Sequence, residues 1–299
     1  MNENVPLGRM TTMGTGGVAR YFAEVASIDE VQEAVRLAAD KDLPFAVIGL
    51  GSNLLVADEG FPGVVVRLVG ELAKVSVDGH VLRAGGGASL AVCLHRARAA
   101  ELGGFEFACA IPGTVGGGVW MNAGAYGGEM ANALDRALVV DALAAEWRDS
   151  VQLGLEYRRS NLNQGEVVVK AEIRLSPTGG DDIRAVVAEM QSRRKAAQPT
   201  NRRTFGSVFK NPLPELAAGR AVEAVGLRGH RHGGAQISPK HANFIENTGD
   251  AVTEDALELI RLARSRVYEQ YGLLLETEVQ FLGPGSAPVG SWPPDAILG

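Results

Sequence analysis

Two glycine-rich loops are the segments of this chain best suited to hold a ligand. Residues 49–53 (GLGSN) follow an apolar run, and residues 111–118 (IPGTVGGG) lead into Asn122-Ala123-Gly124. Successive glycine N–H groups can form a concave nest for phosphate oxygens. The first loop alone also fits a plain tight turn, and it lacks a dinucleotide-binding GxGxxG pattern. The second has four glycines within six residues, which indicates backbone close to a large ligand. Together the loops predict a cofactor with a diphosphate.

A third loop, residues 205–212 (FGSVFKNP), places Ser207 between a glycine and two apolar residues. A serine in this setting is expected to be exposed on a tight bend. The GxSxG pattern and a Ser-His-Asp order are both missing from the sequence, so a hydrolase is only weakly supported. For Ser207 taken alone, a turn hydroxyl is the simpler interpretation.

The histidines and cysteines predict neither a metal site nor a disulfide. His230 and His232 (RGHRHGG) have no cysteine or carboxylate at ligand spacing, so a polar loop is the better interpretation. His241 (SPKHANF) is expected to be structural. The two cysteines, Cys93 and Cys109, lie in apolar sequence without a CxxC partner and are interpreted as buried thiols.

Length and composition describe a folded protein with more than one compact unit. The chain has 299 residues, and a single core seldom grows much beyond about 250 residues. Its net charge of −6 argues against nucleic acid as the main partner, because an acidic chain gains nothing from counterion release. No signal-peptide pattern opens the sequence, and no run of about 18 apolar residues occurs. We therefore expect a protein of the reducing cytosol without a membrane span.

The elements that must position these loops alternate between helix and strand. Ser27 and Glu30 form a capping box that predicts a helix, followed by strands at 43–50, 54–57 and 63–68. A hairpin is expected around Asp78-Gly79, between strands at 75–77 and 81–84. The GGGASL segment then opens a helix that runs to about Glu101.

The second half predicts further strands at 139–142, 151–155, 167–175 and 273–282. A helix is expected at 181–197 with Ile183, Val186, Val187 and Met190 facing inward. A long amphipathic helix at 253–271 is expected to end at Gly272. The segment 177–180 (PTGG) is a plausible domain boundary. The alternation of elements is typical of α+β or α/β domains.

The motifs, taken in order, resemble the UDP-N-acetylenolpyruvoylglucosamine reductase (MurB) family. The matching segments span about residues 11–283, and they are TTMGTGGVARY, VIGLGSNLLVADEGFPGVVV, FACAIPGTVGGGVWMNAGAYGGE, LEYRRSNL, FGSVFKNP, GGAQISPKHANFIENTGDA and LLETEVQFLG. Each segment is a weak signal by itself, whereas all seven in this order are specific.

This resemblance implies an α+β fold with non-covalently bound FAD. Residues 1–68 and 69–177 would be two FAD-binding subdomains of the vanillyl-alcohol-oxidase type. Residues 178–284 would be an α+β domain for the UDP-sugar, and 285–299 an irregular tail. The implied reaction is the NADPH-dependent reduction of the enolpyruvyl ether of UDP-N-acetylglucosamine in peptidoglycan precursor synthesis.

The same resemblance implies a role for each matching residue. Ser207 would be the proton donor, and Arg158 with Glu278 would stabilise the intermediate. Lys195, Asn211 and Tyr157 would contact the nucleotide sugar. The residues implied to hold FAD are Gly49, Leu50, Gly51, Ser52, Asn53, Ile111, Gly113, Thr114, Gly116, Gly117, Asn122 and Gly124.

The chain departs from the family pattern in three places. Leu50 replaces a usual glycine, and Arg202 and Arg203 stand where proline and cysteine often precede the serine loop. The insertion that brings a tyrosine over the substrate in the longer subclass is missing, so the chain resembles the shorter subclass. Two alternatives stay open at this point: an FAD-dependent oxidase of the same fold, and a non-catalytic nucleotide-sugar or flavin-binding module.

Overall fold

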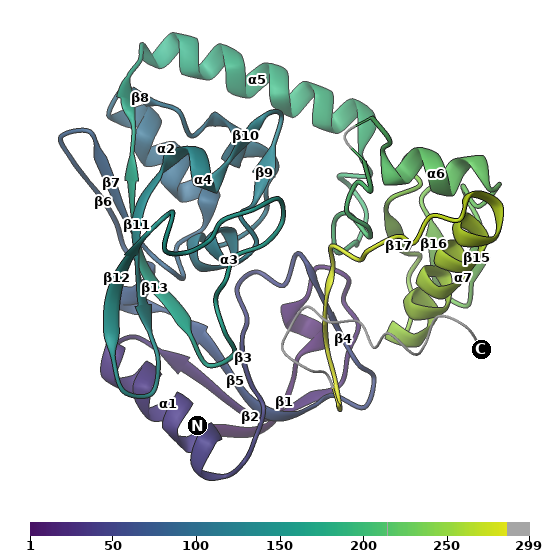
Figure 1. Ribbon diagram of the computed structural model, residues 1–299, viewed down its shortest axis with the longest axis horizontal. Coiled ribbons are helices and arrows are strands. Elements are labelled where there is room, and N and C mark those ends of the chain that lie inside the picture. Colours follow the sequence, from purple (N-terminus) through teal and green to yellow (C-terminus); the bar gives the residue numbers. More distant parts are fainter. Residues whose placement is uncertain (214, 286–299) are drawn as a thin grey trace. The chain divides into compact units, whose positions relative to one another are not determined.

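The computed structural model describes residues 1–213 and 215–285 (Figure 1). Contacts between Cα atoms divide the chain into two compact units. Unit 1 consists of Met1–Glu3, Tyr21–Leu50 and Gly63–Arg194, and unit 2 of Asn4–Arg20, Gly51–Pro62 and Lys195–Gly299. The predicted division at residues 68 and 177 stays a prediction, and the predicted tail, apart from Gly285, lies outside the described residues.

A five-stranded antiparallel sheet forms the centre of unit 1, in the order β12-β11-β13-β7-β6. Along β13, Ala171 and Ile173 are buried in the main core of the unit while Lys170 and Arg174 are exposed, and Val167 and Val169 near its start are buried in a second apolar cluster. The predicted hairpin around Asp78-Gly79 is confirmed by the β6–β7 pair. The strands are β6 (Val75–Asp78), β7 (Val81–Gly85), β11 (Leu134–Val140), β12 (Ala145–Asp149) and β13 (Val167–Arg174).

Helices and two short strand pairs pack on the buried face of this sheet, and α5, which runs along the end of the sheet in Figure 1, adds Ile183 and Val187 to the same core. The Ser89 hydroxyl accepts from Val92 N–H and caps α2, and Thr114 caps α3 in the same way. Ser89 follows the glycines at 85–87, and Thr114 lies inside the second glycine loop, so both caps fix backbone next to glycines. The elements are α2 (Leu90–Ala99), α3 (Val115–Trp120), α4 (Met130–Ala133), α5 (Gly180–Ala197), β8 (Leu102–Gly103) with β14 (Ser176–Pro177), and β9 (Gly124–Ala125) with β10 (Gly128–Glu129).

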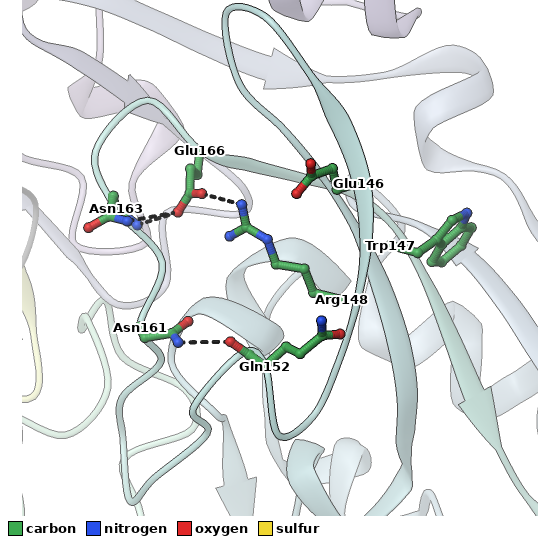
Figure 2. Close-up of a pocket in the computed structure, with 7 residues that line it drawn as sticks. All are labelled: Glu146, Trp147, Arg148, Gln152, Asn161, Asn163 and Glu166. Atoms are coloured by element: carbon green, nitrogen blue, oxygen red, sulfur yellow. Dashed lines mark hydrogen bonds and ion pairs between the residues drawn. The ribbon is translucent and has the colours of Figure 1, made fainter.

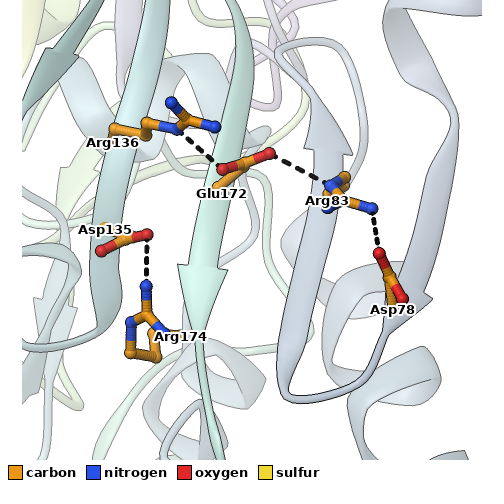
Figure 3. Close-up of polar contacts among 6 residues, drawn as sticks. All are labelled: Asp78, Arg83, Asp135, Arg136, Glu172 and Arg174. Carbon is orange, nitrogen blue, oxygen red and sulfur yellow. Dashed lines mark hydrogen bonds and ion pairs between the residues drawn. The ribbon is translucent and has the colours of Figure 1, made fainter.

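The outward face of the sheet carries linked ion pairs (Figure 3). Glu172 on β13 accepts from Arg136 Nε at 2.7 Å and from Arg83 Nε at 3.1 Å. Arg83 also donates to Asp78 at 2.7 Å. These contacts tie β11 and β7 to the centre strand. The hydrogen bond from Arg136, followed by that from Arg83, lowers the pKa of the buried Glu172 carboxyl.

A second sheet has the order β1-β2-β5-β3 and packs against α1. The Ser27 hydroxyl accepts from Glu30 N–H, which confirms the predicted helix start. The Glu30 carboxylate reaches back to Ala26 N–H at 2.6 Å rather than to Ser27. The first glycine loop follows β3 of this sheet. The elements are β1 (Asn2–Pro6), β2 (Val18–Val25), α1 (Ile28–Asp40), β3 (Phe45–Val47) and β5 (Phe61–Leu68).

Unit 2 packs two helices and a three-stranded sheet, in the order β15-β16-β17, around its own apolar core. Helix α7 ends as predicted at Gly272, which adopts φ +63°. The Asp58 carboxylate accepts from Thr253 N–H and Glu254 N–H, each at 2.9 Å, and so holds the start of α7. The elements are β4 (Leu54–Val56) parallel to β18 (Gln280–Leu282), α6 (Ala218–Ala224), β15 (Arg231–His232), β16 (Ala235–Ile237), β17 (Ile245–Asn247) and α7 (Thr253–Tyr271).

Several local expectations were wrong. Residues 151–155 form a turn instead of a strand, because Asp149 and Gln152 exchange side-chain-to-backbone hydrogen bonds of 2.8 and 3.0 Å that close it. In α5, Val186 is exposed while Val187 is buried. Only Gln280–Leu282 of the predicted last strand is extended in a sheet.

The two cysteines differ in burial. Cys93 is fully buried, and burial raises the pKa of its thiol to about 12. Cys109 is only partly buried, which corrects the expectation for that residue.

Within the described residues, no helix combines the length and the apolar character needed to cross a bilayer.

Candidate functional site

The start of the first glycine-rich loop, Gly49, lies against the second loop within unit 1. A Cβ atom added to Gly49 would lie 2.6 Å from Thr114 Oγ1, so the first loop passes directly against the start of the second. Thr114 is 7% exposed, and its hydroxyl accepts from Gly117 N–H at 3.4 Å. Only a glycine fits at position 49 without displacing that cap. Gly49 and Thr114 therefore lie side by side in unit 1, so one ligand could contact both.

The first loop presents a row of unused backbone donors. Among the described residues, the N–H groups of Gly49, Leu50, Gly51 and Asn53 have no hydrogen-bond acceptor. Gly51 adopts φ +63°. Consecutive free N–H groups at a left-handed bend are the backbone arrangement that binds phosphate oxygens. This loop fits the diphosphate of FAD.

In the second loop, some backbone N–H groups lack an acceptor among the described residues, whereas Gly116 is fixed by packing. Gly113 and Thr114 N–H groups find no acceptor in the part of the chain that the structure describes. Gly116 N–H instead donates to Gly86 O at 2.8 Å, and its added Cβ would lie 3.1 Å from that oxygen. An added Cβ on Gly117 would meet nothing nearer than Thr114 Oγ1, at 3.5 Å. Gly116 is therefore required by packing, whereas an added Cβ at Gly117 would make only an ordinary contact; its role in binding the cofactor stays a prediction.

Asn122, predicted to contact the cofactor, is held inside unit 1 by hydrogen bonds at both ends of its side chain. It is fully buried with φ +38°, its Nδ2 donates to Glu156 O at 2.9 Å, and its Oδ1 accepts from Ala131 N–H at 2.9 Å. Both ends of the side chain are thus engaged inside unit 1. The Gly124 carbonyl, predicted beside the cofactor, accepts from Arg158.

Arg158 lies in a tight turn in which Glu156 and Arg159 exchange backbone hydrogen bonds of 3.0 and 3.1 Å. Its φ of +56° is uncommon for a non-glycine residue and costs of order 1 kcal/mol or more. Its Nη2 donates to Gly124 O at 2.7 Å, and its guanidinium lies 4.9 Å from the centre of the exposed Tyr157 ring. A strained backbone with an oriented cation is typical of a site that binds or stabilises negative charge.

Ser207 lies on a loop that we call the serine arch, residues 203–209. Gly206 takes the left-handed φ of +84°, and its N–H donates to Thr204 Oγ1 at 2.9 Å. Val208 and Phe209 beyond Ser207 are buried. The half-buried Ser207 hydroxyl has no hydrogen-bond partner among the described residues. A hydroxyl that closed the turn would be engaged there, so the turn-hydroxyl interpretation loses support.

The structure brings Glu278 and the end of the first glycine loop to the serine arch, all within unit 2. Glu278 N–H donates to Val208 O at 2.8 Å, and Asn53 Nδ2 donates to Glu278 O at 3.1 Å. An added Cβ on Gly206 would lie 3.4 Å from Ser52 O. Four residues predicted from separate motifs, Ser52, Asn53, Ser207 and Glu278, thus lie on adjoining segments.

The residues predicted to contact the nucleotide sugar are exposed. Lys195 is in the last turn of α5, where its carbonyl accepts from Lys240 Nζ. Asn211 Oδ1 accepts from Ala218 N–H at 3.1 Å and orients the start of α6. Tyr157 is 49% exposed beside Arg158. These three roles stay predictions.

A polar pocket of about 560 Å³ opens elsewhere in unit 1 (Figure 2). Arg148 donates to Glu166 at 2.6 Å, and Glu166 also accepts from Asn163 N–H at 2.6 Å. Figure 2 shows Trp147 on the opposite side of β12 from Arg148. Within the pocket, Arg148 and Glu166 pair with each other, and the lining includes none of the predicted site residues.

Sequence reasoning missed Asn243 and Asn247. Both are buried, at 5% and 7% exposure, on the segment that runs along the serine arch. The available signal was two asparagines that flank the apolar pair Phe244-Ile245 in HANFIEN, since a buried amide must find hydrogen-bond partners. The described residues contain no cluster of three or more His, Cys, Asp or Glu side chains able to hold a metal ion.

Two known protein families match separate parts of the chain. Residues 19–146 match the FAD binding domain family, and residues 198–282 match the family described as the C-terminal domain of UDP-N-acetylenolpyruvoylglucosamine reductase. The first match contains both glycine loops, and the second contains the serine arch and Glu278.

Whole-chain relatives agree with these matches. The UDP-N-acetylenolpyruvoylglucosamine reductase 2 of Symbiobacterium thermophilum is 45% identical over 287 residues, covering 93% of this chain and 91% of the relative. The reductase of Anaeromyxobacter dehalogenans strain 2CP-C is 43% identical, covering 99% and 88%. The crystal structure of the Thermus caldophilus reductase superposes with a TM-score of 0.82 at 39% identity, covering 93% and 98%. The predicted α+β fold is confirmed, and the chain belongs to the UDP-N-acetylenolpyruvoylglucosamine reductase family.

Proposed function

We propose that this protein reduces the enolpyruvyl ether of UDP-N-acetylglucosamine to UDP-N-acetylmuramate, with FAD as cofactor and NADPH as reductant. The observation that carries the proposal is the pairing of the serine arch with the Glu278 segment. That pairing occurs in a chain 45% identical to a reductase named for this substrate. The oxidase alternative is not favoured, because the whole-chain relatives are named as reductases.

The described residues fit FAD. The free N–H groups of residues 49–51 and 113–114 would receive the diphosphate, and the space beside Gly117 would allow close approach. When bound, FAD supplies two-electron chemistry between NADPH and the carbon–carbon double bond of the substrate.

Reduction of a double bond conjugated to a carboxylate puts negative charge on the carbon beside that carboxylate. Arg158, already oriented by Gly124 O, would stabilise the charge as it develops. Glu278 would hydrogen-bond the same group or orient Arg158. The free Ser207 hydroxyl would then donate its proton to the carbon. Lys195, Asn211 and Tyr157 would hold the diphosphate and sugar.

The proposal is tested by the visible spectrum of the purified protein under anaerobic conditions. We expect a yellow protein that NADPH bleaches and that the enolpyruvyl UDP-sugar restores. A colourless protein that takes up no added FAD would overturn the proposal. A bleached protein that oxygen reoxidises rapidly while the UDP-sugar does not would favour the oxidase. The expected location in the reducing cytosol stays a prediction.

A further inference from the structure

Asn243 precedes β17 and contacts the serine arch through three hydrogen bonds. Phe209 N–H donates to Asn243 Oδ1 at 2.9 Å, and Asn243 Nδ2 donates to Phe209 O at 2.8 Å. Val208 N–H donates to the Asn243 carbonyl at 2.9 Å. One carboxamide therefore satisfies both backbone groups of Phe209, in the way that a neighbouring strand would.

The arch has a second anchor at its other end. Asn247 N–H donates to Arg203 O at 2.9 Å, so residues 243 and 247 hold the two ends of the arch. The opposite edge of Val208 is fixed by Glu278 N–H, which donates to Val208 O at 2.8 Å. The backbone on both sides of Ser207 is thus fixed, while its hydroxyl has no hydrogen-bond partner within residues 1–213 and 215–285.

Simple core filling does not explain an asparagine here. Burying an amide costs free energy unless its hydrogen bonds are made, and an aliphatic side chain would fill the space without that requirement. Both polar atoms of the Asn243 side chain form hydrogen bonds with the backbone of Phe209, two residues after Ser207. The neighbours also make room for Asn243: an added Cβ on Gly219 would lie 3.3 Å from both Asn243 N and Asn243 Cβ.

We propose that Asn243 is a positioning residue for Ser207. Its carboxamide fixes the backbone that follows the serine, and this keeps the hydroxyl where the substrate carbon must be protonated. The inference rests on the proposed function and deepens it. A displacement of about 1 Å of a reacting group can cost roughly a hundredfold in rate, so a loosened arch should act on the protonation step.

A double-mutant cycle with Ser207→Ala tests this inference. The measured rate is flavin reoxidation by the enolpyruvyl UDP-sugar in NADPH-reduced holoenzyme. We expect Asn243→Ala to slow this rate roughly thirtyfold to a hundredfold, with NADPH bleaching nearly unchanged. In the Ser207→Ala background, Asn243→Ala should cost less than about threefold, because a residue that acts through Ser207 has nothing left to position. Losses that multiply in the double variant would overturn the inference.

Two further variants keep the test decisive. Asn243→Asp has nearly the same size and keeps an acceptor for Phe209 N–H but loses the donor to Phe209 O, so it enters the same cycle if the alanine variant fails to fold. Asn247→Ala is the matched control, since its side chain bonds Met13, Gly249 and Ala251 outside the arch. Equal slowing by Asn247→Ala and Asn243→Ala would overturn the inference. A wild-type protein that binds FAD but never reacts with the UDP-sugar would overturn the proposed function and the inference with it.

Discussion

The Arg158 turn in unit 1 and the serine arch in unit 2 hold their reactive groups in different ways. Arg158 carries a left-handed backbone, φ +56°, and its side chain is itself anchored to Gly124 O. At the arch Gly206 takes the left-handed conformation, the backbone is anchored, and the Ser207 side chain has no partner among the described residues. A long guanidinium loses about 2 kcal/mol of rotamer entropy when fixed, so it needs its own contact. The Ser207 hydroxyl is attached to Cβ, so fixing the backbone nearly fixes its position.

The largest effect is expected from removing the anchored cation. Arg158→Ala should lower turnover by roughly a hundredfold or more, the scale for losing a preorganised group that faces developing charge. Arg158→Gly should lose as much activity yet unfold at a higher temperature than Arg158→Ala, because glycine accepts φ +56° without strain. Steady-state kinetics and thermal unfolding of both variants measure this. If Arg158→Ala were the more stable of the two, strain at this turn would be excluded.

Two glycines distinguish packing from ligand binding in the neighbouring loops. Gly51→Ala should lower the free energy of unfolding by about 2–3 kcal/mol, because its Cβ would lie 2.1 Å from Met10 O at φ +63°. Gly117→Ala should stabilise the FAD-free protein by up to about 1 kcal/mol, since alanine favours a helix and its Cβ would make only an ordinary contact with Thr114 Oγ1 at 3.5 Å. The same variant should bind FAD more weakly. Unfolding measurements and flavin titration separate the two effects. Unchanged FAD affinity in Gly117→Ala would contradict the proposal that FAD approaches closely beside Gly117.

A pH dependence is expected next to the arch, at His241. Its Nδ1 accepts from Asn243 N–H at 3.2 Å, and burial, aided by Arg228, lowers the pKa of the imidazole. The unfolded chain then binds the proton more readily, so stability should fall as the pH drops below about 6.5 and recover above it. His241→Asn keeps an acceptor but does not titrate. Denaturant unfolding at several pH values should show that this variant loses less unfolding free energy at acid pH than the wild type does. If the two proteins gave parallel curves of unfolding free energy against pH, His241 would be excluded as the cause of the acid-side loss.

The smallest effect is expected on the outer face of the unit 1 sheet. Glu172→Gln should lower the free energy of unfolding by about 1 kcal/mol, because the partially exposed Arg83 and Arg136 lose their shared carboxylate. Turnover should stay within about twofold, since Glu172 belongs to neither reactive segment. Denaturant unfolding and steady-state assays check both statements, and a larger loss of turnover would extend the site to this face.

Local signals predicted much of the fold. The Ser27 cap, the Asp78-Gly79 hairpin and the Gly272 end of α7 each depend on a few consecutive residues, and each is confirmed. The turn at 151–155 was missed because side-chain bonds between Asp149 and Gln152 outweigh an apolar pattern that favours a strand.

The site was predictable only as separate motifs. Glycine loops indicate close backbone contacts, but only the fold shows that Gly49 meets Thr114 while Gly116 serves packing. The left-handed Arg158 gives no sequence signal, since nothing about an arginine indicates φ > 0. Asn243 binds Phe209 across 34 positions of sequence, a separation that no local pattern reports.

The half-reactions of Ser207→Ala, followed by stopped-flow absorbance, test the central claim most directly. The flavin should be bleached by NADPH at nearly the wild-type rate, because that step needs no proton at the substrate carbon. Reoxidation by the enolpyruvyl UDP-sugar should fall by at least about a hundredfold, the scale for losing a general acid, and Ser207→Cys should recover part of it. Normal reoxidation in Ser207→Ala, or equal slowing of both steps, would contradict the assignment of Ser207 as the proton donor.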